Sequence, residues 1–278
     1  MTERRGFTMI TVLWVMGMAA VVSLAGLLAG RNSVRAARNR TDAWRAYWEA
    51  LGCGRRAQAA VDSLLAGASG VAEAGRIWRT LPVQVAASPM VTGCDVSFEA
   101  AGTHVDVNAA TSEVIARALA SVTNVPDSIA AAIVARRDTS PFIDVGELRS
   151  IRGLESATTL DSLFSVEPGR VSLATAPVQV LLAIPGFTAE TADNVVAAQN
   201  AGTPIEDLTT ALIGVSNTAA SELVARFPDA ARLTTPDPDA WVMRSRAARG
   251  VPLSEITIEM RLARVANGVA VIRLRARP

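Results

Sequence analysis

The side chains that could take part in chemistry are few and scattered. The chain contains one histidine, His104, which lies two residues before Asp106 in a predicted strand. Residues two apart in a strand share one face, so these two side chains could form an acid–base pair. A lone histidine beside a turn is more often structural, and the sequence contains no HExxH, P-loop or GxSxG motif. We therefore expect a protein that is not an enzyme.

The two cysteines, Cys53 and Cys94, do not belong to a CxxC pair, which makes a zinc site improbable. If the domain lies outside the cytoplasm, a disulfide between them is chemically permitted. Two unrelated buried thiols are the alternative. The sequence leaves both interpretations open.

Composition narrows the class of protein. The chain has 278 residues, of which 50% are hydrophobic, and its net charge is only +1. This balance argues against intrinsic disorder, and the length is ample for a hydrophobic core. It also argues against a protein built mainly to bind nucleic acid, which would usually be strongly basic.

The N-terminal region contains a membrane-length apolar segment. Residues 7–30 carry no charge, and they are numerous enough to cross a bilayer of about 30 Å as a helix. Basic residues flank the segment on both sides, so the excess of arginine does not fix its orientation. These residues are Arg4 and Arg5 before it, and Arg31, Arg35, Arg38 and Arg40 after it.

The helical pattern continues beyond the apolar segment. Apolar residues recur at spacings of three and four from Ala43 to Leu65, which is typical of one face of an amphipathic helix. Gly67 and Gly70 end the pattern. We expect a helix over residues 7–67, transmembrane over 7–30 and amphipathic over 31–67. The second half needs a sheet to cover its apolar face.

Strand patterns fall in two separated blocks. The first block comprises residues 77–85 and 94–107, with a turn at Ala101-Gly102 after which 103–107 return along the preceding strand. The second block is C-terminal and comprises 241–245, 256–264 and 269–275. The two blocks together predict one sheet whose halves are far apart in the sequence.

The last two strands are predicted to form a hairpin. Side chains alternate between the two faces of a strand, so the loop length decides which residues share a face. A three-residue loop at 266–268 sets Leu262 opposite Ile272 and Met260 opposite Leu274 on one apolar face, and we therefore favour it. The same register sets Arg261 opposite Arg273, which is a mild repulsion.

Residues 108–232 lie between the strand blocks and contain a degenerate helical repeat. Asn108–Ile115 recurs 66 residues later as Ala174–Leu181, and the segment 133–135 recurs 62 residues later as 195–197. Each copy reads as a helix, a tight turn, a second helix and a short capped helix. In the second copy Pro185-Gly186 suits the turn between helices.

The junction Arg5-Gly6-Phe7-Thr8 resembles the class III signal of type IV pilins and type II secretion pseudopilins. The resemblance implies cleavage between Gly6 and Phe7 by a membrane peptidase, with N-methylation of Phe7. Major pilins carry Glu at the fifth mature position, where this chain has Thr11. In lacking this Glu, the chain resembles the K-type minor subunit, which is placed at the filament tip. The alternative is a plain signal anchor with a chance Gly-Phe pair.

The repeats resemble helix-hairpin-helix units, and the order of segments resembles that of K-type minor pseudopilins (general secretion pathway protein K family). The resemblance implies an α+β fold: a pilin-like long N-terminal helix packed on an antiparallel sheet, with an inserted all-helical domain of two degenerate helix-hairpin-helix repeats. The expected divisions are a leader at 1–6, the helix at 7–67, the first part of the sheet at 68–107, the insert at 108–232 and the C-terminal strands at 233–278.

This resemblance implies a structural role at the tip of the type II secretion pseudopilus, in assembly and protein export across the outer membrane. The chain would be held in the inner membrane by one span, with its bulk in the periplasm. The implied partners are the prepilin peptidase, the membrane, the pseudopilus and the I- and J-type minor pseudopilins, with no nucleic acid and no small-molecule substrate.

The alternative is a minor pilin of a type IV pilus or competence system whose helix-hairpin-helix domain contacts DNA. Such units bind phosphate through backbone N–H groups of a glycine-rich hairpin. Glu190 and Asp193 follow the second hairpin and would repel phosphate, whereas Arg136 and Arg137 in the first copy are basic but suit a solvated helix face.

K-type subunits bind calcium as a family, so the resemblance makes calcium possible, although no cofactor is required. Carboxylate oxygens are suitable ligands, but no EF-hand spacing selects among the candidates. The candidates are Asp144, Glu147, Glu206, Asp207, Asp237 and Asp239. The alternative is that these are solvated loop carboxylates and helix caps, and Asp144 with Glu147 fits a capping box.

Overall fold

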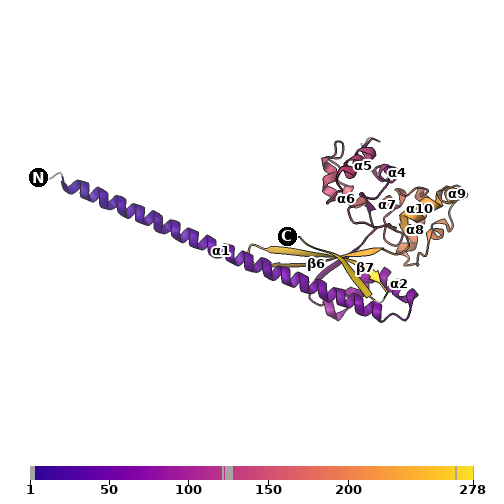
Figure 1. The fold of residues 1–278 in the computed structure, drawn as a ribbon, viewed down its shortest axis with the longest axis horizontal. Helices are drawn as coiled ribbons and strands as arrows, with labels where there is room; N and C mark the ends of the chain where they lie inside the picture. Colours follow the sequence, from indigo (N-terminus) through magenta and orange to yellow (C-terminus); the bar gives the residue numbers. More distant parts are fainter. Residues whose placement is uncertain (1–3, 121, 123–127, 267, 278) are drawn as a thin grey trace.

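One helix dominates the shape of the molecule. The computed structural model describes residues 4–120, 122, 128–266 and 268–277, and only the backbone of residues 4–10. Helix α1 (Arg4–Ala66) is continuous over 63 residues and is therefore about 95 Å long. Figure 1 shows its N-terminal half projecting alone from a body that contains the sheet and the remaining helices. The predicted long helix is confirmed.

The segment after α1 is helical, and the predicted strand at 77–85 is wrong. It forms α2 (Val71–Arg79) and α3 (Leu81–Ala86), followed by the short 3-10 helix η1 (Pro89–Val91). The buried side chains are Ile77, Trp78, Leu81 and Val85. These spacings of one, three and four place the apolar side chains on one side of a helical path instead of alternating them across a strand.

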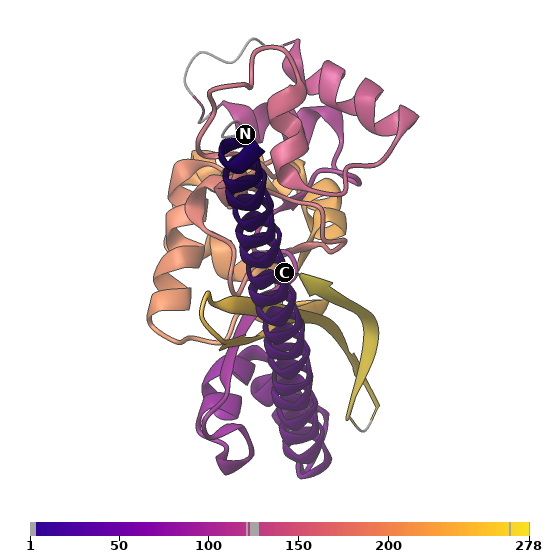
Figure 2. The same ribbon diagram turned by 90° about the vertical axis from the view of Figure 1, so that its left-hand side faces the viewer.

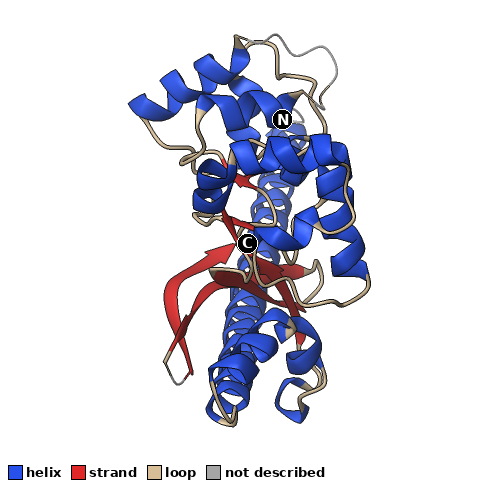
Figure 3. Ribbon diagram, turned by 90° about the vertical axis from the view of Figure 1, so that its right-hand side faces the viewer, coloured by secondary structure: helices blue, strands red, loops and turns tan. Residues whose placement is uncertain are grey.

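Four antiparallel strands form the main sheet in the order β1-β6-β7-β8. Their bounds are β1 (Asp95–Ala100), β6 (Ala240–Arg249), β7 (Ser254–Val265) and β8 (Gly268–Arg277). The two sequence blocks meet at β1 and β6, where Phe98 lies opposite Met243. Figure 3 shows these strands lying across α1. The sheet therefore closes only when residues 141 to 151 positions apart pair.

The hairpin between β7 and β8 differs in part from its prediction. Met260 lies opposite Leu274 as expected, but Leu262 lies opposite Val271, not Ile272, and Val265 pairs with Gly268. The loop therefore comprises Ala266 and Asn267, of which Asn267 lies outside the described residues. A register shift between Arg261 and Leu262 accommodates one extra residue on β8. This bulge keeps the apolar set on one face while the turn stays short.

The predicted return strand at 103–107 is also wrong in its pairing. Its regular part is β2 (Val105–Asp106), which pairs in parallel with β3 (Phe164–Ser165) and not with β1. Gly102 has a φ of +89°, and a Cβ added there would lie 1.9 Å from the carbonyl oxygen of Arg170. The glycine therefore lets the chain leave the sheet and enter the insert.

Small residues let α1 approach the sheet closely. Ala46, Ala50, Ala57 and Ala60 are at most 1% exposed and face buried residues of β6 and β7. The Ser245 hydroxyl donates a 2.7 Å hydrogen bond to the carbonyl oxygen of Ala50. Figure 2, viewed along the helix, shows the strands crossing its axis. Close packing of this kind depends on the absence of side-chain bulk on the inner face of α1.

The insert has its own core and repeats the same plan twice. The first copy contains α4 (Ser112–Leu119), α5 (Ile129–Thr139), η2 (Val145–Ser150) and α6 (Leu160–Leu163) between β2 and β3. The second contains α7 (Val178–Leu182), α8 (Ala189–Asn200), η3 (Leu208–Leu212), α9 (Asn217–Ala225) and α10 (Phe227–Leu233). It lies between β4 (Val171–Ser172) and β5 (Thr234–Thr235).

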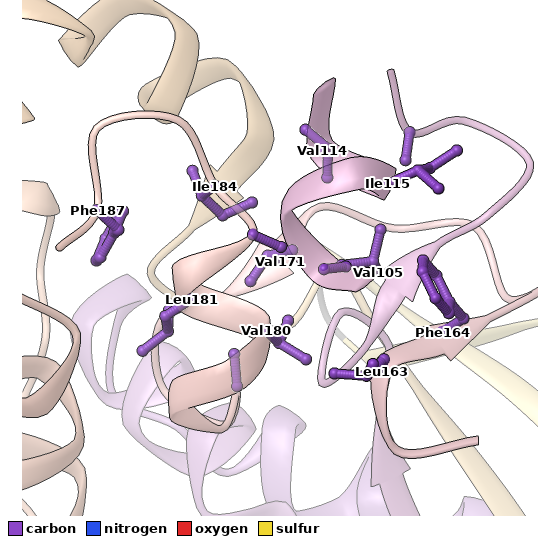
Figure 4. Close-up of a cluster of buried hydrophobic side chains, with 14 of the residues drawn as sticks. Val105, Val114, Ile115, Leu163, Phe164, Val171, Val180, Leu181, Ile184 and Phe187 are labelled. Carbon is purple, nitrogen blue, oxygen red and sulfur yellow. The ribbon is translucent and has the colours of Figure 1, made fainter. Parts of the chain in front are cut away.

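A two-residue parallel pairing closes the base of each copy, β2 with β3 and β4 with β5. The first strands of the two copies, at Val105 and Val171, are offset by 66 residues, the same offset as the sequence repeat. Figure 4 shows Val105, Val171 and Phe164 among the buried side chains that both copies share. The copies therefore form one core, which is separate from the core between α1 and the sheet.

Two glycines in α1 test the packing of the helix on the sheet. A Cβ at Gly54 would lie 2.8 Å from Met260 Cε and 3.0 Å from Ser245 Oγ, whereas one at Gly52 meets nothing within 4 Å. We expect Gly54→Leu to lower the free energy of unfolding by about 2 kcal/mol through overpacking. Gly52→Leu, the matched control, should raise it by up to about 0.8 kcal/mol through helix propensity. Urea unfolding of the full chain in detergent measures both, and equal effects would contradict this packing.

Candidate functional site

The proposed processing site lies at the free end of α1. Residues 6 and 7 are helical in backbone, and their side chains lie outside the described part of the chain. Thr11 is exposed and begins the described part of an apolar stretch, none of which is buried. By length and composition this stretch is a candidate membrane anchor. Cleavage between Gly6 and Phe7 remains a prediction.

The two cysteines form a disulfide. Cys53 is buried on α1, Cys94 immediately precedes β1, and their Cα atoms are 5.5 Å apart. The Arg56 guanidinium lies 2.7 Å from Cys94 Sγ and 3.2 Å from Cys53 Sγ. The bond joins residues 41 positions apart in the sequence, and the segment that it closes includes α2, α3 and η1. It therefore fastens the first strand of the sheet to the long helix.

The six candidate calcium ligands lie at separate places. Asp144 and Glu147 form a capping box at the start of η2, and Asp207 caps η3 at the corresponding point of the second copy. Among the described residues, no group of three or more acidic, His or Cys side chains could hold a metal ion. The candidates therefore do not fit one calcium site, and the capping interpretation accounts for these three.

The other three candidates do not converge either. Glu206 is exposed next to Asp207. Asp239 accepts hydrogen bonds from the Arg170 guanidinium at 2.8 and 3.3 Å and from the Arg170 backbone N–H at 3.1 Å. Asp237 lies 3.4 Å from Arg79, and burial raises the pKa of its carboxyl group. The last two carboxylates thus bind arginines where the insert joins the sheet.

The suggested acid–base pair of His104 and Asp106 does not form. His104 Nδ1 lies 3.3 Å from Glu99 Oε1 instead, whereas Asp106 is buried and accepts a 2.9 Å hydrogen bond from the Asn108 backbone. Hydrogen bonds from His104 and Arg244 lower the pKa of Glu99 to about 2. Glu99 thus links the segment that follows β1 to Arg244 on β6, which is a structural role.

A charged clamp at the base of the insert was not predicted from the sequence. The Glu167 carboxylate, between β3 and β4, lies 3.3 Å from Arg261 and also contacts Arg273. The Arg261 guanidinium also donates to the Pro168 carbonyl. The side chains of Glu167 and Arg261 are 12% and 9% exposed, so the pair is largely desolvated. The sequence did offer one signal for this clamp. Arg261 and Arg273 were predicted to lie opposite each other, and two adjacent arginines are stable only with a carboxylate near them.

The hairpin of the second repeat is not accessible. Gly186 has a φ of +90° and is buried, and a Cβ there would lie 2.8 Å from Arg226 Cβ and 3.3 Å from the Glu222 carbonyl oxygen. The corresponding hairpin of the first repeat, 123–127, lies outside the described residues. Arg137 donates to the carbonyl groups of Val107 and Ala110 at 3.0 and 2.6 Å.

The Arg136 guanidinium donates a 2.6 Å hydrogen bond to the Ser140 carbonyl and a 3.4 Å hydrogen bond to the Glu147 carboxylate. Both arginines that were considered for DNA contact are therefore held by internal acceptors.

One face of α1 beyond the apolar stretch has no sheet over it. We call this face the outer stripe; its residues follow one another at spacings of three and four and are all exposed. They are Trp44, Trp48, Gly52, Arg55 and Ala59. The rings of Trp44 and Trp48 stack with centroids 6.4 Å apart, although each residue is about 60% exposed. Exposed paired tryptophans of this kind are typical of an interaction surface.

Removing the disulfide should loosen the join between α1 and β1. We expect the double variant Cys53→Ala/Cys94→Ala to lose about 3–4 kcal/mol of unfolding free energy, because the closed segment is long. A reductant should destabilise the wild-type chain similarly and leave the double variant unchanged. Equal sensitivity of the two to reductant would contradict the bond.

The Glu99 contacts should make stability depend on acid pH. Since the folded-state pKa of about 2 lies below the ordinary value of 4.5, the stabilisation is present above pH 4.5 and is lost as the pH falls toward 2. Glu99→Gln should cost about 1 kcal/mol at pH 7, because solvent screens a partly exposed pair, and should flatten the acid limb. Glu255→Gln, which removes a more exposed carboxylate, should leave that limb unchanged. Urea unfolding from pH 7 to pH 3 measures both.

Comparison with known proteins supports the fold. No protein-family model matches the chain, and no curated protein matches it. Among solved structures, it is similar to one chain of the crystal structure of the GspK-GspI-GspJ complex from enterotoxigenic Escherichia coli Type 2 Secretion System. The identity is 13%, the TM-score is 0.54, and the match covers 88% of this chain and 99% of that chain. The long helix, the antiparallel sheet and the helical insert thus together form a GspK-like fold.

Proposed function

We propose that this chain is a K-type minor pseudopilin at the tip of a type II secretion pseudopilus, where it supports assembly of the filament and protein export across the outer membrane. The observation that carries the proposal is α1 itself. One continuous helix has an apolar half whose described side chains, from residue 11 onward, have nothing packed against them, and a second half that packs on a sheet. This arrangement suits a subunit that is held in a membrane and then joins a bundle of helices.

The exposed half of α1 needs an apolar environment. Its large side chains, such as Trp14, Val15 and Val22, are at least 66% exposed. Their transfer from water is favourable in lipid and equally in a filament core made of similar helices. Under the proposal, the prepilin peptidase removes residues 1–6 at the inner membrane and methylates Phe7, and the body stays in the periplasm.

Two features favour the tip over an internal place in the filament. The insert lies at the end of the molecule far from the N-terminus, where it would obstruct a subunit stacked above (Figure 1). In pilins, the carboxylate at the fifth mature position pairs with the N-terminal amine of a neighbouring subunit. This chain has Thr11 at that position and cannot form the pair. A subunit at the tip has no neighbour above it that requires this pairing.

The outer stripe of α1 is the surface on which neighbouring helices would pack. Gly52 and Ala59 permit close approach of another helix, while Trp44 and Trp48 supply apolar area. The complex to which the similar chain belongs contains GspI and GspJ, and we propose the equivalent I- and J-type minor pseudopilins as partners here. This role needs no cofactor and no catalytic group.

DNA contact by the insert is the second candidate, and the structure gives it less support. The backbone of a helix-hairpin-helix unit reaches phosphate only from an open hairpin, and Gly186 is covered by α9. DNA binding by the full chain would fall steeply with salt if it occurred. We expect no salt-dependent binding to duplex DNA, together with co-purification of the I- and J-type subunits.

Processing provides the direct test. Mass spectrometry of the N-terminus, in cells that contain the peptidase, should find a mature chain that begins with methylated Phe7. Gly6→Leu should retain the leader, because the peptidase cuts after glycine, and Gly17→Leu within the apolar stretch should still be processed. An intact leader on the wild-type chain would contradict the assignment.

A further inference from the structure

We propose that the free edge of β8, from Ile272 to Arg277, binds an extended segment of a partner protein in which carboxylate and apolar side chains alternate. The partner strand would continue the sheet beyond β8. This inference is independent of the function proposed above, because it rests on the edge of the sheet and not on α1 or the leader.

The edge is open and long enough for this pairing. β8 is the last strand in the order β1-β6-β7-β8, so among the described residues only β7 pairs with it. Helix α1 contacts β8 at its beginning, where the Asp62 carboxylate accepts a 2.7 Å hydrogen bond from the Val269 backbone. Residues 268 and 269 are buried, whereas 272, 274, 276 and 277 are exposed. Six residues at the end of the strand span about 20 Å, a typical strand length.

The charge on this edge favours an acidic partner. Arg273, Arg275 and Arg277 point to one face of the strand. Glu259 lies opposite Arg275 on β7 and 3.6 Å from both Arg273 and Arg277, and Glu167 also contacts Arg273. Two carboxylates thus face three arginines, and Arg275 itself forms no ion pair among the described residues. Burial and the adjacent charges of Arg275 and Arg277 lower the pKa of Arg273. Carboxylates on a strand at the free edge would relieve the repulsion that remains among the three arginines.

The opposite face of the same edge is apolar and partly uncovered. Leu274 and Ala276 lie across from Met260 and Ile258, which are fully buried beneath α1. Leu274 itself is 40% exposed and Ile272 is 55% exposed, because the helix does not cover this corner. A strand beside β8 would therefore place carboxylates on one face and apolar side chains on the other. This alternation defines the chemistry of the partner.

A second copy of the chain does not satisfy this chemistry. In an antiparallel pair, directly opposite residues point to the same face. Two β8 strands paired edge to edge with matching faces would set arginines against arginines, and with opposed faces would set arginines beside apolar side chains; both are unfavourable. The arginines thus select against self-pairing. The competing explanation is that the arginines block strand pairing of every kind, and it predicts that no peptide binds to this edge.

The test uses the full chain in detergent and a fluorescent eight-residue peptide of alternating glutamate and valine, with fluorescence anisotropy as the readout. We expect saturable binding that a peptide of the same composition with its four glutamates in one block does not reproduce. Lack of saturable binding, or equal binding of the two peptides, would overturn the proposal.

Backbone N-methylation tests whether the peptide pairs as a strand. Alternate N–H groups point to opposite edges of a strand, so methylating all valine nitrogens and methylating all glutamate nitrogens block different edges. One of the two methylated peptides should bind like the parent, and the other should bind at least about tenfold more weakly. Two methylated peptides that bind equally would contradict strand pairing.

Charge removal tests the position. Arg275→Gln should weaken binding of the alternating peptide about threefold or more, because an attractive cross-strand pair is lost, and it sets no second carboxylate opposite Glu259 on β7. Arg152→Gln changes the net charge equally at an exposed site in the insert and should leave the affinity unchanged. Equal loss in both variants would show that general charge attraction, not the β8 edge, binds the peptide.

Discussion

A single uninterrupted helix has to satisfy two different environments, and the rest of the structure follows from this constraint. Along the described part of its first half, from residue 11, α1 carries apolar side chains on all sides and no protein covers them. Along its second half, the face that packs on the sheet consists largely of small residues such as Ala50, Gly54 and Ala57. These residues bring the sheet so close that Ser245 bonds the helix backbone directly. The sheet thus covers one side of the rod and leaves the outer stripe for other contacts.

The insert is mounted on this assembly as a second folded body. Each of its two copies is closed by its own parallel strand pair, so the insert does not draw on the main sheet for its core. It is fastened at the base by desolvated or bidentate arginine–carboxylate pairs, which include Glu167 with Arg261 and Asp239 with Arg170. A bulky domain held in this way at the far end of the helix is consistent with a terminal subunit, which is the proposed role.

Local periodicity was sufficient for the elements that local sequence determines. The long helix, the C-terminal strands and the repeat could be predicted because their patterns extend over many residues. The segment 77–85 was mistaken for a strand because two short helices, separated at Thr80, offer too few turns for the 3.6-residue period to stand out. The pairing of β2 with β3 joins residues 59 positions apart, and no local signal specifies it. The clamp at Glu167 was missed for the same reason, since its partners lie on strands about 100 residues later. Among the candidate metal ligands, the cap pattern at Asp144 was the stronger signal and is the one the structure realises.

The central claim is that the outer stripe of α1 meets the helices of similar subunits. Site-specific photocrosslinking in cells that assemble the secretion apparatus tests it most directly, with a benzoylphenylalanine in place of Trp48 on the stripe or of Val224 on the exposed surface of the insert. We predict covalent adducts with another minor pseudopilin from position 48 and none from position 224. An assembled subunit that gives no adduct from position 48, or the same adducts from both positions, would contradict the claim.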